Sequence, residues 1–265
     1  MINIAWIKDL RSRQFADRGY EDGFLAQAQR YLSEDRQRFH SCHAFVAPTE
    51  TFANEVMRWY GAEKPWFQFA NYPLKVKKPS GLSAMVRKRE IVYIDNGSSL
   101  YQEQLYQAIL LFLGEIYRQT KCAGVFIPPR NFHNDVLRLT IPNGVRVIDR
   151  RNWDKLSAYG LLVNLDNFRG AAESLPRKLL VYLHSGMYPV VHWSFTESIK
   201  FCQRNGVTPI CYLGIDDLVT EMERIPDNLS LSNGMEVDVL PPIKRNQFCI
   251  ENRICDLVEY LKEMG

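Results

Sequence analysis

Residues 174–191 read S-L-P-R-K-L-L-V-Y-L-H-S-G-M-Y-P-V-V, and they decide how the rest of the chain is interpreted. Pro176 opens a predicted helix and Gly186 ends it, because proline is common in a first helical turn and glycine just after a last one. The helix has an apolar run at Leu179, Leu180, Val181 and Leu183. A strand is predicted before it at 161–166 and another after it from Pro189, so the stretch predicts a strand–loop–helix–strand unit.

Lys178 lies in the first turn of this predicted helix. A helix N-terminus already carries partial positive charge, so a cation there is unfavourable unless an anion shares the site. Free N–H groups at a helix N-terminus bind anions, and phosphate is the usual ligand. The alternative is a solvated lysine whose stem covers the turn. Charge placement alone does not separate the two explanations.

The composition is that of a globular protein, with 46% hydrophobic and 24% charged residues in a chain of 265. The net charge of +3 is not typical of nucleic-acid binding, no Lys/Arg-rich run with interleaved aromatic residues occurs, and the basic run 87–89 is short, so no nucleic-acid partner is expected. The six cysteines form no C-x-x-C pair, so the sequence suggests neither a zinc site nor a redox motif. Scattered single thiols fit a reducing cytosol better than a disulfide framework.

The sequence shows no targeting or membrane-spanning segment. Residues 1–11 lack the apolar core of a signal peptide. The longest apolar run, 108–113, is too short to span a bilayer. A cytoplasmic protein is expected, and peripheral contact with the inner membrane face is compatible with this interpretation.

Short strands alternate with helices from Glu90 to Ile225, in about six units. Such alternation predicts βαβ units and a parallel sheet. We therefore expect an α/β fold with a doubly wound, Rossmann-like sheet whose ligands bind at the carboxyl ends of the strands. The expected strands are 91–94, 124–127, 145–148, 161–165, 188–192 and 209–213, and the expected helices are 100–120, 131–139, 152–158, 176–185, 196–205 and 216–224.

A smaller α/β segment is expected before this domain. Its predicted strands are 2–7, 44–47 and 66–70, and its predicted helices are 19–39 and a second one capped by Thr49 and ended by Gly61. A Pro-, Lys- and Gly-rich stretch follows it. The predicted organisation is an amino-terminal segment (1–73), a linker (74–89), the Rossmann-like domain (90–240) and a carboxyl-terminal helical segment (241–265).

Three loops at the carboxyl ends of predicted strands are candidates for ligand binding. The first contains Asn96, Gly97, Ser98 and Ser99, whose backbone and hydroxyl donors suit an anion, although such loops are also ordinary helix caps. It fits neither G-x-G-x-x-G nor the P-loop. The second contains Asp149 and Arg150, and is either a base contact or simply a polar strand end. The third, 166–176, holds Glu173, and loops in that position tend to be functional.

Several catalytic classes lack their motifs. The sequence contains no D-x-D pair, no H-E-x-x-H and no G-x-S-x-G. His184 and His192 are each open to a catalytic or a structural role, and the structural role is the commoner one. Trp193 is either a surface on which a base or sugar packs or, more commonly for such a residue, a half-buried part of the core.

The order of features in the second half resembles a known family. These features are Pro176-x-Lys178, Tyr182-Leu183, Gly186, 189–191, Trp193-Ser194, Phe201 and Gly206, and upstream 145–149, Trp153, Leu156 and 159–161. They resemble the carboxyl-terminal half of GT-B glycosyltransferases, in particular bacterial glucosyl- and galactofuranosyl-transferases that elaborate surface polysaccharides or glycoproteins. The resemblance covers roughly 91–223. An extra residue in Met187-Tyr188 departs from the pattern.

The resemblance implies a nucleotide-diphospho-sugar donor, with transfer to a glycan, glycoprotein or lipid-linked acceptor and with no metal ion or cofactor. It implies that Lys178 neutralises the diphosphate and that 96–99 touch the distal phosphate. It further implies that 148–150 read the base, while Tyr182 or its neighbours line the ribose. The E-x7-E pattern of retaining members is absent, and Glu173 lies near it but out of register, so the stereochemical outcome stays open.

The same resemblance identifies 1–73 as part of an acceptor-binding domain and 246–264 as the helix that crosses back onto it. Only two or three strands of that domain are recognisable, as in a truncated chain, a minimal enzyme or half of a split one. A partial sheet leaves open edges and bare apolar faces, so a partner chain or self-association is predicted. Two alternatives are a non-catalytic, glycosyltransferase-like binding or scaffold subunit and an unrelated Rossmann-like protein.

Overall fold

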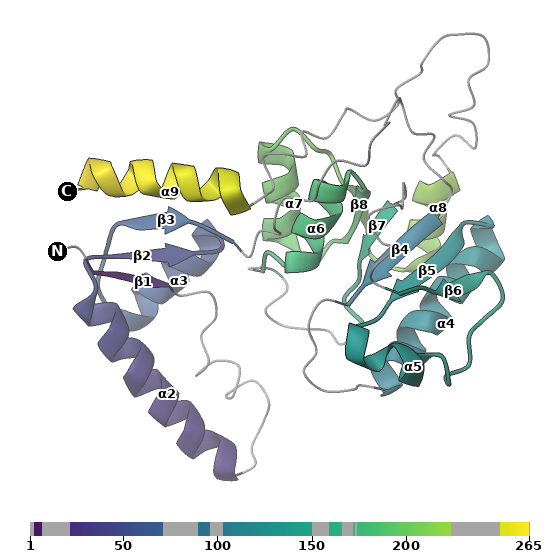
Figure 1. Ribbon diagram of the computed structural model, residues 1–265, viewed down its shortest axis with the longest axis horizontal. Coiled ribbons are helices and arrows are strands. Elements are labelled where there is room, and N and C mark those ends of the chain that lie inside the picture. The colour runs from purple at the N-terminus through teal and green to yellow at the C-terminus, as the bar shows by residue number, and fades with distance from the viewer. Residues whose placement is uncertain are drawn as a thin grey trace, which may run out of the picture. The chain divides into compact units, whose positions relative to one another are not determined.

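The computed structural model describes residues 3–6, 22–70, 90–95, 103–149, 159–165, 172, 174–223 and 250–264 (Figure 1). The predicted linker 74–89 and the predicted helix 152–158 lie outside the described residues. The chain forms two compact units, one of residues 1–71 with 253–265 and one of residues 72–252. The four domain ranges given above stay a prediction.

The larger unit contains a six-stranded sheet in the order β6-β5-β4-β7-β8-β9. Every neighbouring pair in it is parallel. The strands are β4 (Glu90–Ile94), β5 (Ala123–Ile127), β6 (Val145–Val147), β7 (Tyr159–Leu162), β8 (Tyr188–His192) and β9 (Ile210–Tyr212). The strand order reverses between β4 and β7, and ligands of such sheets bind in the crevice at that switch point. The predicted doubly wound, Rossmann-like fold is therefore confirmed.

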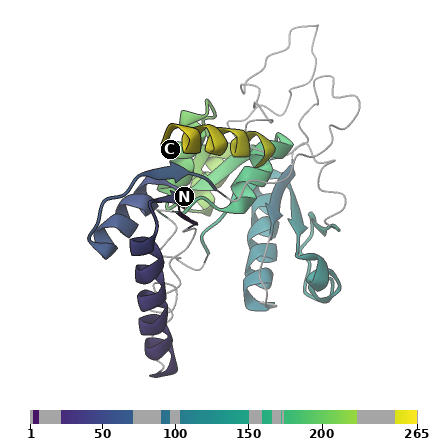
Figure 2. The ribbon, with the colours of Figure 1, turned by 60° about the vertical axis from the view of Figure 1, so that its left-hand side comes forward.

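Helices cover both faces of this sheet (Figures 1 and 2). On one face, Ile91 and Tyr93 share a core with α4 (Glu103–Thr120) and α8 (Ile215–Glu223). On the other face, Val92 and Ile94 pack with α6 (Arg177–Ser185). The alternation follows from the two-residue period of a strand, which sends neighbouring side chains to opposite faces. Between β8 and β9 the chain forms α7 (Thr196–Arg204).

Two predicted elements differ from the structure beyond a residue or two at their ends. The helix expected at 131–139 is a 3₁₀ turn, Arg130–Phe132, followed by one turn of α-helix, α5 (His133–Val136). The strand expected at 161–165 begins earlier and ends earlier, because Tyr159 already pairs with both Ile91 and Tyr188. Residues 163–165 thus leave the sheet at its carboxyl edge.

The smaller unit contains three parallel strands in the order β1-β2-β3. They are β1 (Ile4–Trp6), β2 (Ala44–Ala47) and β3 (Trp66–Gln68), with α2 (Asp22–Ser41) and α3 (Glu50–Tyr60) between them. The final helix, α9 (Ile250–Met264), packs against β3: the Tyr260 and Phe67 rings lie 5.0 Å apart, and Arg253 donates a hydrogen bond to the Gln68 carbonyl.

The boundaries predicted for α3 are confirmed. The Thr49 hydroxyl accepts a hydrogen bond from the Phe52 N–H at 3.1 Å, which satisfies one of the donors that a helix start leaves unpaired. Gly61 ends the helix in the left-handed conformation, with φ of 66°.

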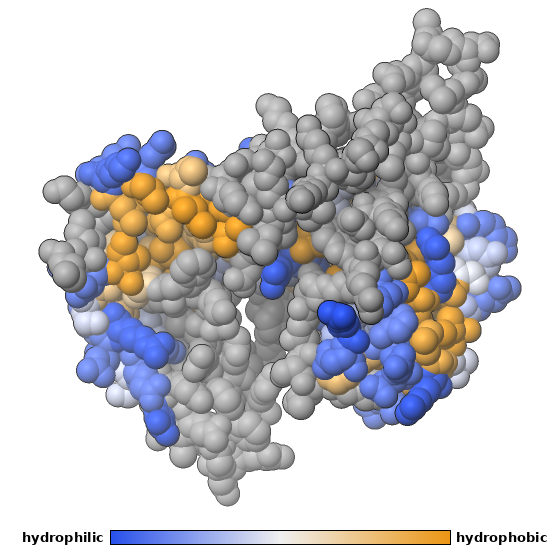
Figure 3. Space-filling view, in the orientation of Figure 1, coloured by the Kyte–Doolittle hydropathy of each residue, from blue (hydrophilic) through white to orange (hydrophobic). Residues whose placement is uncertain are grey.

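No described helix is both long enough and apolar enough to cross a bilayer. Apolar surface is nevertheless visible over α9 in Figure 3. Ile254 and Val258, both on this helix, have 46% and 44% of their surfaces exposed.

Candidate functional site

The carboxyl ends of β4 and β7 are joined by one side chain from α6. The Tyr182 hydroxyl accepts a hydrogen bond from the Ile94 N–H at 2.9 Å and donates one to the Leu161 carbonyl at 3.0 Å. Its ring lies against Gly160, where an added Cβ would approach the ring to 2.2 Å. Burial raises the pKa of Tyr182 well above its usual value, so the phenol is neutral.

The buried position of Tyr182 corrects the expectation that its side chain lines a ribose. The side chain is 0% exposed and its hydroxyl bonds to two backbone groups. Its role is structural, because it fixes α6 over the switch point between β4 and β7. The sequence signal for this role is Gly160, which makes room for a ring that comes from another element.

Lys178 projects from the first turn of α6 to the carboxyl edge of the sheet. Its Nζ donates a hydrogen bond to the Tyr93 hydroxyl at 2.8 Å and lies 4.2 Å from the centre of the Tyr93 ring. α6 packs on the face of Val92 and Ile94, whereas Tyr93 belongs to the opposite face. The lysine side chain therefore extends over the carboxyl edge of the sheet, and its ammonium group lies at the switch point.

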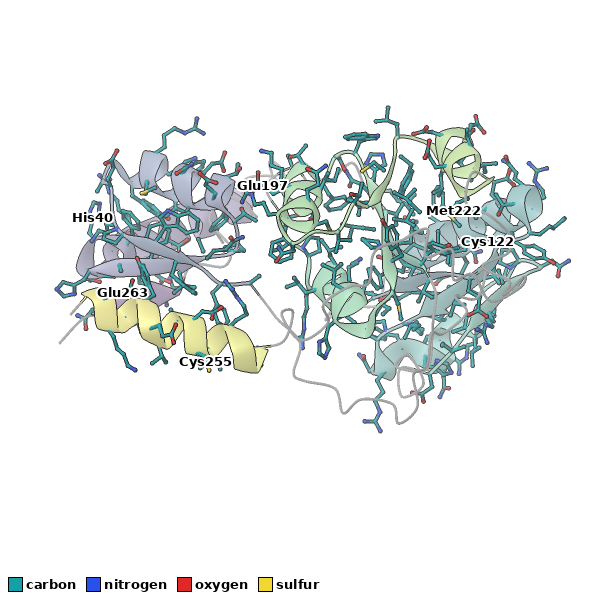
Figure 4. The ribbon with its side chains drawn as sticks, turned by 90° about the horizontal axis from the view of Figure 1, so that it is seen from above. His40, Cys122, Glu197, Met222, Cys255 and Glu263 are labelled. Carbon is teal, nitrogen blue, oxygen red and sulfur yellow. The ribbon has the colours of Figure 1, made fainter. Side chains whose placement is uncertain are left out.

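The segment that leads into α6 is held in place by α7. The Ser198 hydroxyl donates to the Ser174 carbonyl at 2.8 Å, and the Glu197 N–H donates to the Ala172 carbonyl at 2.9 Å. The Glu197 carboxylate, whose position on α7 is labelled in Figure 4, is nearly buried and pairs with Lys200 at 3.0 Å. α6 then starts at Pro176, which provides no side-chain cap.

Two aspartates lie at the same edge of the sheet. Asp95 follows β4 directly, and its carboxylate accepts a hydrogen bond from the Tyr106 hydroxyl at 2.9 Å. Asp149, a predicted base contact, follows β6 and is partly buried. β6 lies two positions from β4 in the sheet, on the side away from β7.

The other predicted site residues lie outside the described residues: Asn96, Gly97, Ser98, Ser99, Arg150 and Glu173. The structure thus places Lys178 at the switch point and Asp149 on the same edge, and it moves Tyr182 into the core. The sequence does not predict Tyr93 as the partner of Lys178. Tyr93 is 85 residues away in the chain and on the opposite face of the sheet, so no local pattern indicates the pair.

A second polar group lies at the carboxyl ends of β7, β8 and β9. Asn164 donates to the Ser194 hydroxyl at 3.0 Å, and His192 contacts both that hydroxyl and the Leu213 carbonyl at 2.8 Å. A carbonyl only accepts, so Nε2 of His192 carries the proton and Nδ1 accepts from Ser194. Both ring nitrogens therefore have partners in the fold, as in a structural histidine.

Trp193 is 48% exposed, which agrees with the half-buried position that is the commoner expectation for such a residue. In the described part of the chain, no group of three or more His, Cys, Asp and Glu side chains is arranged to hold a metal ion.

Comparison with known proteins identifies the fold. No family model and no curated protein match the chain. Among solved structures, it is similar to a mutant of S. aureus TarM in complex with fondaparinux, alpha-GlcNAc-glycerol and UDP, with a TM-score of 0.51, 12% identity and coverage of 85% of this chain and 44% of that one. It is also similar to a chain of the GtfA/B complex, with a TM-score of 0.50, 10% identity and coverage of 88% and 48%.

Both neighbours are GT-B glycosyltransferases. This chain has a GT-B-like fold. At these identities the likeness concerns the fold alone, and the chain spans less than half the length of either neighbour.

Proposed function

We propose that this chain binds a nucleotide-diphospho-sugar and takes part in transferring the sugar to a glycan, glycoprotein or lipid-linked acceptor, without a metal ion. The observation that carries the proposal is the position of Lys178, whose ammonium group lies at the switch point of a Rossmann-like sheet beside the start of a helix. The presence of UDP in the TarM structure supports a nucleotide as the ligand of this fold.

The chemistry of the proposed reaction needs positive charge at this place. When the bond between sugar and diphosphate breaks, negative charge develops on the leaving phosphate oxygens. A fixed ammonium group and helix N-terminal N–H groups stabilise that charge more strongly at a partly buried site than in water. A lysine ammonium carries a full positive charge and three N–H donors, which suits Lys178 to binding phosphate oxygens.

The other parts of the donor are the base, the distal phosphate and the transferred sugar, and we assign each of them to further residues. In this proposal Asp149 contacts the base at the end of β6, together with Arg150. The loop 96–99 contacts the distal phosphate, and Glu173 lies near the transferred sugar. These assignments rest on the resemblance of the sequence and on the position of Lys178.

The test is calorimetric titration with UDP, GDP, ADP, dTDP and CMP, in EDTA and again with Mg²⁺. One nucleotide should bind equally well in both buffers. Lys178→Gln should weaken its binding about 10- to 100-fold, the range for losing a hydrogen bond to a charged group. Lys121→Gln is the matched control, because Lys121 precedes β5 at the opposite, amino-terminal edge of the sheet. Wild-type affinity in Lys178→Gln contradicts the proposed role.

Turnover separates an enzyme from a binding subunit. Both bind the nucleotide-sugar, but only an enzyme releases nucleoside diphosphate from it at a rate above the uncatalysed one. The chain covers less than half of each neighbour, so we propose that a partner chain or a second copy completes the acceptor side. Release that depends on such a partner supports the split arrangement. Nucleotide binding without release under any condition supports a non-catalytic subunit.

A further inference from the structure

The turn that follows β8 presents an indole ring on a rigid backbone. The Phe195 N–H donates to the His192 carbonyl at 3.0 Å, which closes the turn, and the Trp193 N–H donates to the Tyr212 carbonyl at 2.9 Å. The Ser194 N–H donates to Nδ1 of His192 at 3.2 Å. Hydrogen bonds therefore fix the backbone of Trp193 and of the residues before and after it, while about half of the Trp193 side chain is exposed to solvent.

Polar residues lie on the same turn as Trp193 and at the end of the neighbouring strand β7. Ser194 is hydrogen-bonded to His192 and to Asn164, and all three lie at the carboxyl ends of the strands beside Trp193. Leu213, at the end of the neighbouring strand β9, is 68% exposed. A flat apolar surface with fixed hydroxyl and amide groups next to it matches a sugar ring, which has an apolar face and a rim of hydroxyl groups.

The place of Trp193 along the sheet indicates which part of a ligand it meets. The strand order is β6-β5-β4-β7-β8-β9, with Lys178 at the switch point between β4 and β7. Asp149, on the base side of the proposed donor, follows β6. A nucleotide-sugar whose diphosphate lies at Lys178 and whose base points toward β6 directs its sugar toward β8. At about 4.8 Å per strand, β8 lies roughly 10 Å from β4.

We infer that Trp193 is the stacking surface of a carbohydrate subsite, with Ser194 and Asn164 at the rim of the bound ring. The assignment of that carbohydrate to the donor sugar rests on the proposed function. The backbone of the turn is already ordered by its own hydrogen bonds, so binding a sugar there does not require the turn to be ordered first.

The experiment compares UDP with UDP-glucose, UDP-galactose and UDP-GlcNAc by calorimetry. Trp193→Ala should weaken binding of at least one UDP-sugar about 3- to 10-fold, the range for losing one stacked ring, and should leave UDP unchanged. Trp193→Phe should restore part of the loss. Trp59→Ala is the matched control, because Trp59 lies on α3 in the smaller unit with a similar exposed fraction of 45%.

The possible results are distinct. If UDP and the UDP-sugars lose affinity equally, or if neither loses any, the carbohydrate subsite is wrong while the nucleotide site stands. If the wild-type chain binds another nucleotide in place of UDP, sugar conjugates of that nucleotide replace the UDP-sugars in the same comparison. If it binds none of the nucleotides tested, the proposed function fails, and saturation-transfer NMR with free glucose, galactose and GlcNAc decides. Sugar signals that Trp193→Ala removes and Trp59→Ala keeps support the subsite. Signals that are absent, or that survive in Trp193→Ala, overturn it.

Discussion

Tyr182 connects two strands that belong to different halves of the doubly wound sheet. Its hydroxyl accepts from the Ile94 N–H and donates to the Leu161 carbonyl, both at the end of the sheet where ligands bind. A water molecule cannot replace the hydroxyl easily, because the side chain is fully buried. The two backbone groups therefore depend on this one phenol.

Replacing Tyr182 by phenylalanine should lower the free energy of unfolding by about 2–4 kcal/mol, because it leaves a buried donor and a buried acceptor unpaired. Urea unfolding followed by circular dichroism measures the change. Tyr117→Phe is the control: the Tyr117 side chain on α4 is only partly buried, so loss of its hydroxyl should cost about 0.5 kcal/mol or less. Equal costs for the two variants would show that Tyr182 has no special role.

At the scale of elements, the fit of α6 on β7 depends on Gly160. An alanine Cβ there would lie 2.2 Å from the Tyr182 ring, so the ring, and with it α6, would have to move. Lys178 is on the first turn of α6 and would move with it.

Gly160→Ala should therefore destabilise the larger unit by about 3 kcal/mol and weaken nucleotide binding at the same time. Thermal unfolding and the calorimetric titration test the two effects. Gly214→Ala is the control, because nothing lies within 4 Å of the added Cβ, and its cost should be about 1 kcal/mol or less. A stable Gly160→Ala variant with wild-type nucleotide affinity contradicts this coupling.

The same elements show what the sequence can predict. The alternation of short strands and helices after Glu90, and the cap residues Thr49 and Gly61, are local signals, and the structure confirms them. The sequence does not indicate the start of β7, because glycine, here Gly160, has a low propensity for β-strands. Its presence in the strand is explained only by the Tyr182 ring that packs on it.

The candidate site, too, is predictable from the sequence only where the signal is local. Lys178 is identified by its place in a first helical turn, which is a local feature. Its partner Tyr93 and the rigid turn around Trp193 depend on hydrogen bonds between distant segments, and no sequence period encodes those.

The molecule as a whole contains buried phenols in both units. Burial raises the pKa of Tyr182 and of Tyr212 in the larger unit, and burial together with the nearby Asp35 carboxylate raises the pKa of Tyr60 in the smaller one. In the unfolded chain these phenols titrate near pH 10. The folded chain thus holds more protons than the unfolded chain above about pH 10, and stability falls as the pH rises further.

Each such phenol should remove about 1.4 kcal/mol of unfolding free energy per pH unit above its unfolded pKa. Lysines also titrate in that range, so the informative quantity is the difference between the wild type and Tyr182→Phe. Phenylalanine has no proton to lose in the unfolded chain, so the cost of the substitution should shrink as the pH rises from about 9 to 11. Urea unfolding across that range measures it, with Tyr117→Phe as control, since the Tyr117 side chain on α4 is only partly buried. A cost for Tyr182→Phe that stays constant with pH would mean that the phenol titrates alike in the folded and unfolded chain, and the buried link between β4 and β7 would then be wrong.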